Sequence, residues 1–419
     1  MLRDRRNLGA VVAQLGTVLE FYDFFIFGAA AATVFPALFY PTLGKIGGAV
    51  ATMVAYGIGY ADRPVGALLF RRFGRGQPDT RLLVAATVLV GVPTTAIGLL
   101  PTHSTIGAPA GVLLIVLRGL QGIGLGGEWA RVPFAMADQP DPAARGMRAT
   151  VAQLAAPVGM LMGYAVFAIA AAVAPGEDYL HWGWRVPFLF SGVLITGLLA
   201  ARLPLPRVAG RTGTSDSVNL LGFCRLHWRE LLIAIAVRAG SDAAFYVMAL
   251  YVLGYVTGHL GLSKSVGFTA VVVGACAQLA GISLFGALAV RVPRRWIVVC
   301  GALASAVWAF AYFILLDSRI AALIYLACGV GVFCNAAMWS PARVFIPELF
   351  PPGLRHAGTG LGFQLAAIFG GGVTPLMSVV LVAWFGSGQA VAVYIATLLL
   401  VSATAAALAG GDVVETSEK

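Results

Sequence analysis

The chain consists largely of long hydrophobic runs separated by short polar segments. A helix of about 20 apolar residues crosses the ~30 Å hydrocarbon core of a bilayer. Twelve runs are long enough, and we predict a membrane-spanning helix in each. They are 8–39, 46–70, 81–100, 106–137, 146–174, 184–205, 229–257, 265–290, 295–316, 320–346, 356–385 and 389–410. The pattern therefore predicts an all-α membrane protein. The first run is too long for a signal peptide, so we interpret it as a retained helix.

Composition and charge exclude most other classes of protein. Hydrophobic residues make up 59% of the 419 positions and charged residues only 11%, whereas soluble proteins carry about 25% charge. The net charge of +10 would suit a nucleic-acid partner, but the basic residues lie between hydrophobic runs, as in membrane proteins. The cysteines and histidines show no metal-ligand spacing, so we expect no metal and no cofactor.

Lysine and arginine gather in alternate loops, which predicts the orientation in the membrane. With a cytoplasmic N-terminus, the cytoplasmic side carries Arg3, Arg5, Arg6, Arg71, Arg72, Arg75, Arg81, Arg145, Arg148, Arg207, Arg211, Arg225, Arg229, Arg291, Arg294, Arg295, Arg343 and Arg355. The other side carries Lys45, Arg185, Lys264 and Arg319. Both termini are therefore predicted to be cytoplasmic.

The chain also contains an internal repeat. The segment from Arg145 to Ala156 parallels the segment from Arg355 to Ala367, and Phe-Tyr pairs occur in the first and seventh spans. Two six-helix halves around a central cavity explain these matches and suit a transporter that alternates about a central site. The predicted parts are an N-terminal half 1–205, a cytoplasmic linker 206–228, a C-terminal half 229–410 and a cytoplasmic tail 411–419.

Charged residues within the predicted spans are the main functional candidates, because a charge inside a bilayer is costly and usually faces a water-filled path or a partner. Carboxylates in such surroundings can carry protons. The candidates for proton coupling are Glu20, Asp23, Glu128 and Asp242. Arg118 and Arg238, one in each half, could bind a carboxylate through paired hydrogen bonds. The alternative is that Glu20–Arg118 and Arg238–Asp242 are internal ion pairs that only fix the helices.

Further candidates for substrate binding are Tyr22 and Tyr246, in aromatic clusters, and Gln121 and Gln364. The glycines from Gly122 to Gly127 match the pattern G-x-G-x-x-G, but a dinucleotide site needs a preceding strand. Here the pattern lies in an apolar helix, so we interpret these glycines as allowing close helix packing. With no Walker A sequence and no catalytic constellation, an enzyme is not expected.

Several motifs resemble the major facilitator superfamily, and within it the metabolite:proton symporter family. They are LEFYDFF in the first span, RPVGALLF after Tyr60, LRGLQGIGLGGEW in the fourth span, GWRVPFL at Gly183 and PELFPPGLRHAG at Pro347. This branch includes carriers for citrate, 2-oxoglutarate, proline/betaine and shikimate. The resemblance implies proton-coupled uptake of a small organic acid or zwitterion by alternating access, with Glu20, Asp23, Arg118 and Glu128 at family motif positions.

The resemblance also implies a cytoplasmic gate, in which this chain departs from the family. The family has an aspartate in the loop after the second span, where this chain has Arg75, and the matching loop after the eighth span has Val290. Asp79 could substitute. The gating candidates are Arg63, Arg71, Arg75, Arg145, Arg291 and Arg355.

These observations predict a secondary active transporter in the inner membrane. The leading hypothesis is proton-coupled uptake of a small carboxylate-bearing metabolite by a monomer, with the substrate, protons and the lipid bilayer as its partners. An exporter of a secondary metabolite or drug is one alternative, and a membrane sensor that does not transport is another.

Overall fold

The computed structural model describes residues 2–73, 79–129, 150–202 and 220–409. In this part of the chain the regular structure is helical, and eleven helices are long and apolar enough to cross a membrane. The predicted span 46–70 falls on two further helices, α3 (Gly44–Ala61) and α4 (Arg63–Phe73), which are separated by a turn at Asp62. The all-α membrane architecture is thus confirmed.

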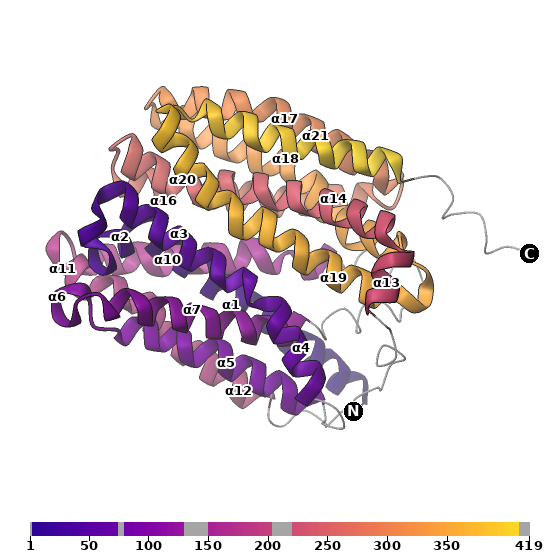
Figure 1. Ribbon diagram of the computed structural model, residues 1–419, viewed down its shortest axis with the longest axis horizontal. Coiled ribbons are helices and arrows are strands. Elements are labelled where there is room, and N and C mark those ends of the chain that lie inside the picture. The colour runs from indigo at the N-terminus through magenta and orange to yellow at the C-terminus, as the bar shows by residue number, and fades with distance from the viewer. Residues whose placement is uncertain (1, 74–78, 130–149, 203–219, 410–419) are drawn as a thin grey trace, which may run out of the picture. The chain divides into compact units, whose positions relative to one another are not determined.

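The chain divides into two compact units. Unit 1 comprises residues 1–131, 154–210 and 250–275. Its other elements are α1 (Leu2–Thr33), α2 (Phe35–Phe39), η1 (Pro41–Leu43), α5 (Asp79–Leu99), α6 (His103–Ile106), α7 (Pro109–Trp129), α10 (Ala155–Val173), α11 (Glu177–His181), η2 (Gly183–Arg185), α12 (Val186–Arg202), α15 (Val252–Gly254) and η5 (Tyr255–His259). Figure 1 shows α5, α7 and α12 running side by side within this unit.

Unit 2 comprises residues 132–153, 211–249 and 276–419. Its elements are α13 (Leu220–Leu226), α14 (Trp228–Tyr246), α17 (Arg294–Asp317), α18 (Ala321–Glu348), η6 (Pro352–Leu354), α19 (Arg355–Ala367), η7 (Ile368–Val373), α20 (Thr374–Phe385) and α21 (Gln389–Leu408). The chain passes between the units within η4 (Val247–Tyr251) and within α16 (Lys264–Leu288). The halves expected from the repeat, 1–205 and 229–410, stay a prediction.

Small residues allow the helices of unit 1 to pack closely. A Cβ atom on Gly122 of α7 would lie 2.6 Å from the carbonyl oxygen of Gly59 on α3, and one on Gly159 of α10 would lie 2.5 Å from that of Val18 on α1. Neither position has room for a side chain. This geometry confirms that the glycines of the G-x-G-x-x-G pattern serve helix packing.

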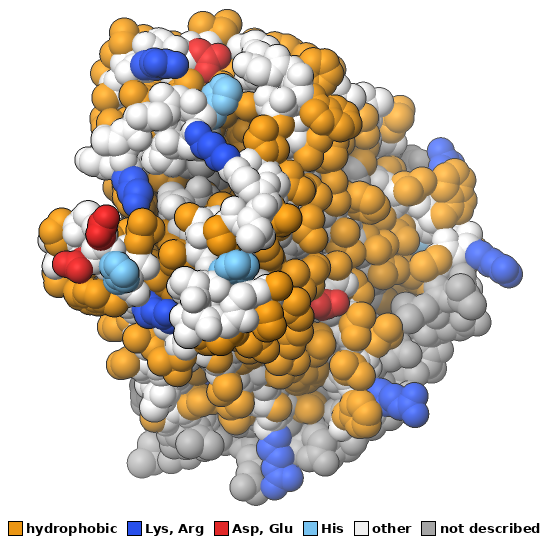
Figure 2. All heavy atoms as spheres, turned by 60° about the vertical axis from the view of Figure 1, so that its left-hand side comes forward, with side chains coloured by type: hydrophobic (Ala, Val, Ile, Leu, Met, Phe, Trp, Pro, Cys, Tyr) orange, Lys and Arg blue, Asp and Glu red, His pale blue; other side chains and the backbone are white. Residues whose placement is uncertain are grey.

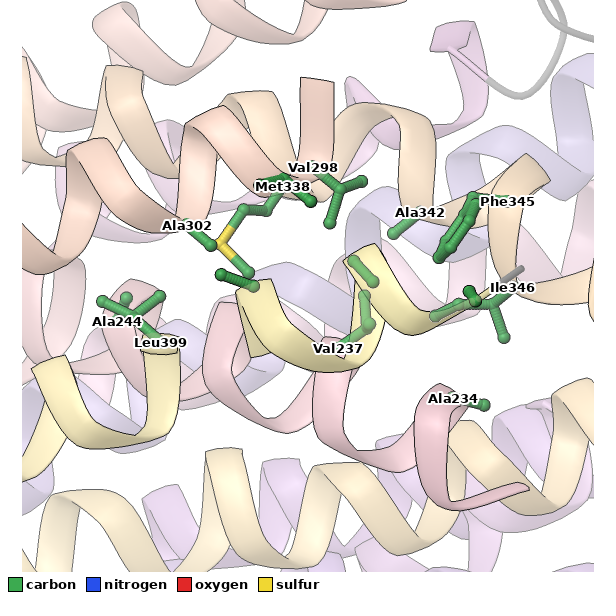
Figure 3. Packing of buried hydrophobic residues seen from close by; sticks show 14 of the residues in the cluster. Ala234, Val237, Ala244, Val298, Ala302, Met338, Ala342, Phe345, Ile346 and Leu399 are labelled. Carbon is green, nitrogen blue, oxygen red and sulfur yellow. The ribbon is translucent and has the colours of Figure 1, made fainter. Parts of the chain in front are cut away.

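The core of unit 2 lies among α14, α17, α18 and α21 (Figures 1 and 3). Ala234 and Val237 come from α14, Val298 and Ala302 from α17, and Met338 from α18, and all five are buried. Small alanine and valine side chains let these helices approach one another, and the flexible Met338 fills the space among them (Figure 3).

Hydrophobic side chains cover much of the face seen in Figure 2. Val307 is 75% exposed and Trp384 is 79% exposed, whereas Arg118 and Asp242 are buried. This inversion of the soluble pattern is what a helix bundle in lipid requires, because its exposed side chains face hydrocarbon.

Candidate functional site

Asp23 lies in the middle of α1 and is almost completely buried, with 4% of its surface exposed. Two hydroxyl groups donate to its carboxylate. Ser191 Oγ on α12 lies 2.5 Å from Oδ1, and Thr94 Oγ1 on α5 lies 3.1 Å from Oδ2. The carboxylate is therefore fixed between three helices of unit 1.

Thr94 continues this hydrogen-bonded chain toward α7. Gln121 Nε2 donates to Thr94 Oγ1 at 2.6 Å, and Arg118 Nη1 donates to Gln121 Oε1 at 3.1 Å. The single hydroxyl proton of Thr94 has two acceptors within reach, Asp23 and the carbonyl oxygen of Val90 at 2.8 Å. Since only one of them can receive it, the choice depends on whether Asp23 carries a proton.

Arg118 ends the chain in an aromatic box. Its guanidinium carbon lies 4.2 Å from the ring centroid of Phe27 and 5.2 Å from that of Tyr56, and the side chain is 1% exposed. Its Nε and Nη2 atoms have no hydrogen-bond partner, and among the described residues no carboxylate lies within ion-pair distance. The structure contradicts the interpretation of Arg118 as the ion-pair partner of Glu20.

A small pocket inside unit 1 joins three of the predicted carboxylates. Glu20, Asp23 and Glu128 line a space with room for about one water molecule. Arg202, at the end of α12, forms a 2.8 Å ion pair with Glu128 and donates to the hydroxyl of Thr87. Glu128 therefore has a buried cationic partner, whereas Asp23 is bound by neutral hydroxyl groups.

In unit 2, Arg238 and Asp242 form the ion pair that was considered from the sequence. The closest atoms, Nη2 and Oδ1, are 2.8 Å apart, one helical turn along α14. The guanidinium carbon lies 4.0 Å from the ring centroid of Trp339 on α18. Arg238 Nη1 has no hydrogen-bond partner within the described part of the chain, so the arginine is only partly satisfied by Asp242.

The other predicted substrate residues have different surroundings. Tyr22 is buried, and its hydroxyl donates to the carbonyl oxygen of Pro187 at 2.7 Å within unit 1. Tyr246 packs against Phe245 with ring centroids 5.2 Å apart, and Gln364 on α19 is half-buried. Their roles in binding stay predictions.

The gating candidates are only partly described. Arg63 is buried, with its guanidinium 4.4 Å from the ring centroid of Tyr60. Arg291 is exposed, and Arg355 Nε donates to the carbonyl oxygen of Phe350 at 3.3 Å. Arg75 and Arg145, and the side chain of Arg71, lie outside the described residues.

The sequence model of the Major Facilitator Superfamily matches residues 13–367. The chain belongs to the major facilitator superfamily. Its relatives in this family include the shikimate transporter of Escherichia coli K12, which is 29% identical over 414 residues that cover 96% of this chain and 94% of that protein. The proline/betaine transporter of Salmonella typhimurium LT2 is 25% identical over 430 residues. This match covers 97% of this chain and 83% of that transporter.

Solved structures of the superfamily show the same fold. A crystal structure of a D-xylose–proton symporter superposes with a TM-score of 0.72 at 21% identity, covering 98% of this chain and 99% of that one. A partially occluded inward-open structure of the Escherichia coli xylose transporter XylE also gives 0.72, at 18% identity and with coverage of 94% and 95%. The protein is therefore a multi-pass membrane transporter, and its relatives are transporters rather than enzymes.

The structure places three residues beside the predicted carboxylates that the sequence did not reveal as candidates. Thr94 and Ser191 bind Asp23, and Arg202 binds Glu128. Hydroxyl groups in apolar helices commonly bond to the carbonyl oxygen four residues earlier, as Thr94 also does, so spacing does not identify them. Arg202 lies at a helix end, where a basic residue usually indicates only the orientation of the helix in the membrane.

Proposed function

We propose that this superfamily member carries out proton-coupled uptake of a small carboxylate-bearing metabolite across the inner membrane, with both termini in the cytoplasm. The supporting observation is the hydrogen-bonded chain from Asp23 to Arg118, since it connects a buried carboxylate to a buried cation without an ion pair. Asp23 is the proton carrier, and Arg118 binds the substrate carboxylate.

Thr94 links the protonation state of Asp23 to the proposed substrate site at Arg118. When Asp23 is ionised, Thr94 donates to it at 3.1 Å; when Asp23 is protonated, the carboxyl group donates to Thr94, and the threonine proton turns to Val90. Either arrangement reaches Gln121 through the same oxygen atom. Loading of the proton therefore alters the polarisation of the amide that positions Arg118.

Arg118 suits a carboxylate ligand. Its Nε and Nη2 atoms are unpartnered, and these two neighbouring donors match the two oxygen atoms of a carboxylate in a bidentate arrangement. A buried cation without a carboxylate partner is energetically unfavourable, so an anionic substrate would relieve that cost. Arg238 provides a second cation in unit 2, partly neutralised by Asp242.

The relatives support a carboxylate substrate. Shikimate, proline and betaine, which appear in the names of two of them, each carry one carboxylate group. A relative of Escherichia coli is named an inner membrane metabolite transport protein, which supports the proposed location.

Uptake into proteoliposomes tests the proposal. Purified protein is reconstituted, and labelled shikimate, proline and citrate are offered with and without an inward proton gradient. Concentrative uptake that requires the gradient supports symport. Equal internal and external concentrations of the substrate, both with and without the proton gradient, would contradict proton coupling. The absence of both binding and uptake at every pH would contradict the proposal altogether.

A further inference from the structure

The guanidinium group of Arg118 is enclosed by three aromatic rings of unit 1. Its carbon atom lies 4.2 Å from the ring centroid of Phe27 and 5.3 Å from that of Phe24, both on α1. It lies 5.2 Å from the ring centroid of Tyr56 on α3. All four side chains are buried, with at most 3% of their surface exposed. A cation over the face of an aromatic ring is attracted by the π-electrons, and this attraction is strongest where water is excluded.

The three rings also contact one another. The centroids of Phe24 and Tyr56 are 5.0 Å apart, and those of Phe27 and Tyr56 are 6.2 Å apart. Phe35 of α2 packs against Phe27 in turn, at a centroid distance of 5.2 Å. Ring pairs at such separations attract one another. Phe24, Phe27 and Tyr56 together therefore form the aromatic box of Arg118, held in place by their mutual contacts.

The main chain of α3 lies against another side of the guanidinium. A Cβ atom on Gly59 would lie 2.5 Å from Arg118 Nε, so there is no room for a side chain between them. Gln121 is the one side-chain acceptor that the described residues offer to Arg118, at 3.1 Å. A buried cation is unfavourable without a compensating charge. In this part of the chain the ring faces supply the negative potential that a carboxylate would otherwise supply.

We propose that the aromatic box is the partner of Arg118 in the empty site, that the substrate carboxylate takes over this role, and that Phe27 thereby determines the affinity for the substrate. This inference rests on the function proposed above and concerns the same binding group. Phe27, whose ring is the closest of the three, is a positioning residue, because it acts on the substrate through the charge of Arg118.

The argument compares the empty site with the occupied site. In the empty site, the positive charge of Arg118 is attracted by the ring faces. In the occupied site, the arginine and the carboxylate are together neutral, and the carboxylate is repelled by the same π-electrons that attract the cation. The rings therefore stabilise the empty site more than the occupied site, and they weaken the binding of the acid. Weaker binding favours release of the substrate at the end of each transport cycle.

Stepwise fluorination of the Phe27 ring tests the inference, because fluorine withdraws electron density from the ring face with little change in shape. The variants are Phe27→fluoro-Phe, Phe27→difluoro-Phe and Phe27→trifluoro-Phe, each made in the full chain. The probe is whichever of shikimate, proline and citrate the purified wild type binds, and its methyl ester is the comparison without the carboxylate charge. We expect the trifluoro variant to bind the acid roughly tenfold more tightly, equivalent to about 1.4 kcal/mol. The affinity should rise with each added fluorine atom, and the affinity for the ester should not change.

Thermal unfolding provides a second measurement, and Phe35 provides the control. Fluorination of Phe27 should lower the unfolding midpoint of the substrate-free protein, and it should lower the midpoint less when the acid is present at a saturating concentration. Phe35 is also buried and packs against Phe27, whereas the described ring contacts of Arg118 do not include it. The same fluorinated series at Phe35 should leave the affinity for the acid unchanged.

Four results would overturn the inference. If fluorination of Phe27 leaves the affinity for the acid unchanged, the carboxylate does not take over from the box, although binding by the wild type still supports a carboxylate carrier. Equal loss of affinity for the acid and its ester means that the ring contacts the substrate directly. An equal effect of fluorination at Phe35 means that fluorine acts through packing. If the wild type binds none of the three acids at any pH, the function proposed above is wrong and the inference fails with it.

Discussion

Replacement of Asp23 by asparagine should abolish proton-driven accumulation and leave the fold intact. An asparagine at this position can accept from Ser191 through Oδ1 and donate to Thr94 through Nδ2, and the threonine proton then turns to the carbonyl oxygen of Val90 at 2.8 Å. The variant keeps both helix contacts and resembles the protonated carboxyl group. It lacks only the ability to release the proton.

The size of the effect follows from the number of carriers. Asp23 is the one carboxylate that the described hydrogen bonds connect to Arg118, so the proposed cycle moves one proton with each monoanionic substrate and is electroneutral. A gradient of one pH unit then provides about 1.36 kcal/mol, which supports a concentration ratio of roughly ten at equilibrium. Asp23→Asn should reach a ratio of about one under the same gradient.

The assay uses proteoliposomes clamped at zero membrane potential, with shikimate as the labelled probe. Exchange of internal for external substrate is measured in parallel and should persist in Asp23→Asn, since it does not require release of the proton. Glu20→Gln is the matched comparison, because Glu20 lines the same small pocket. Tenfold accumulation by Asp23→Asn, or its loss in Glu20→Gln alone, would refute the assignment of the carrier.

Three further predictions concern other residues of unit 1. Thr94→Val should reduce gradient-driven uptake more than exchange, and Thr94→Ser should restore both; equal losses in uptake and exchange would argue against a coupling role. Arg202→Gln should lower the free energy of unfolding by about 3–5 kcal/mol, since Glu128 is buried and pairs with Arg202 at 2.8 Å. Thermal unfolding of the double variant with Glu128→Gln should show that most of this stability is recovered. Gly122→Ala should lower the unfolding midpoint, because its Cβ atom would lie 2.6 Å from a backbone oxygen of α3; Gly197→Ala, with nothing within 4 Å, should not.

Much of the architecture could be predicted because the bilayer leaves few alternatives. Backbone groups in hydrocarbon must bond within their own segment, so long apolar runs indicate helices directly. The exception is the span 46–70, in which Asp62 coincides with a turn between α3 and α4. The charged residues were also identifiable, since a buried charge such as Arg118 is conspicuous in an apolar run.

The partners of those charges could not be predicted. Periodicity places Arg118 and Gln121 on one face of α7, and they are indeed bonded, but it does not reveal which side chain of another helix completes the chain. Thr94 comes from α5 and Ser191 from α12, and both are ordinary hydroxyl residues in apolar surroundings. Their positions depend on helix rotation and packing, which are properties of the whole unit.

The two buried arginines that the sequence offered as carboxylate-binding candidates differ in their partners, and this difference gives the proposed cycle its order. Arg238 has Asp242 beside it, so its charge is partly compensated whether or not substrate is present. Among the described residues, Arg118 has only the amide of Gln121 and aromatic rings as partners, so in the proposed cycle an incoming carboxylate changes its energy most. Because Arg118 is also the arginine connected to Asp23, binding of the anion and of the proton stabilise each other within unit 1 in the proposed cycle.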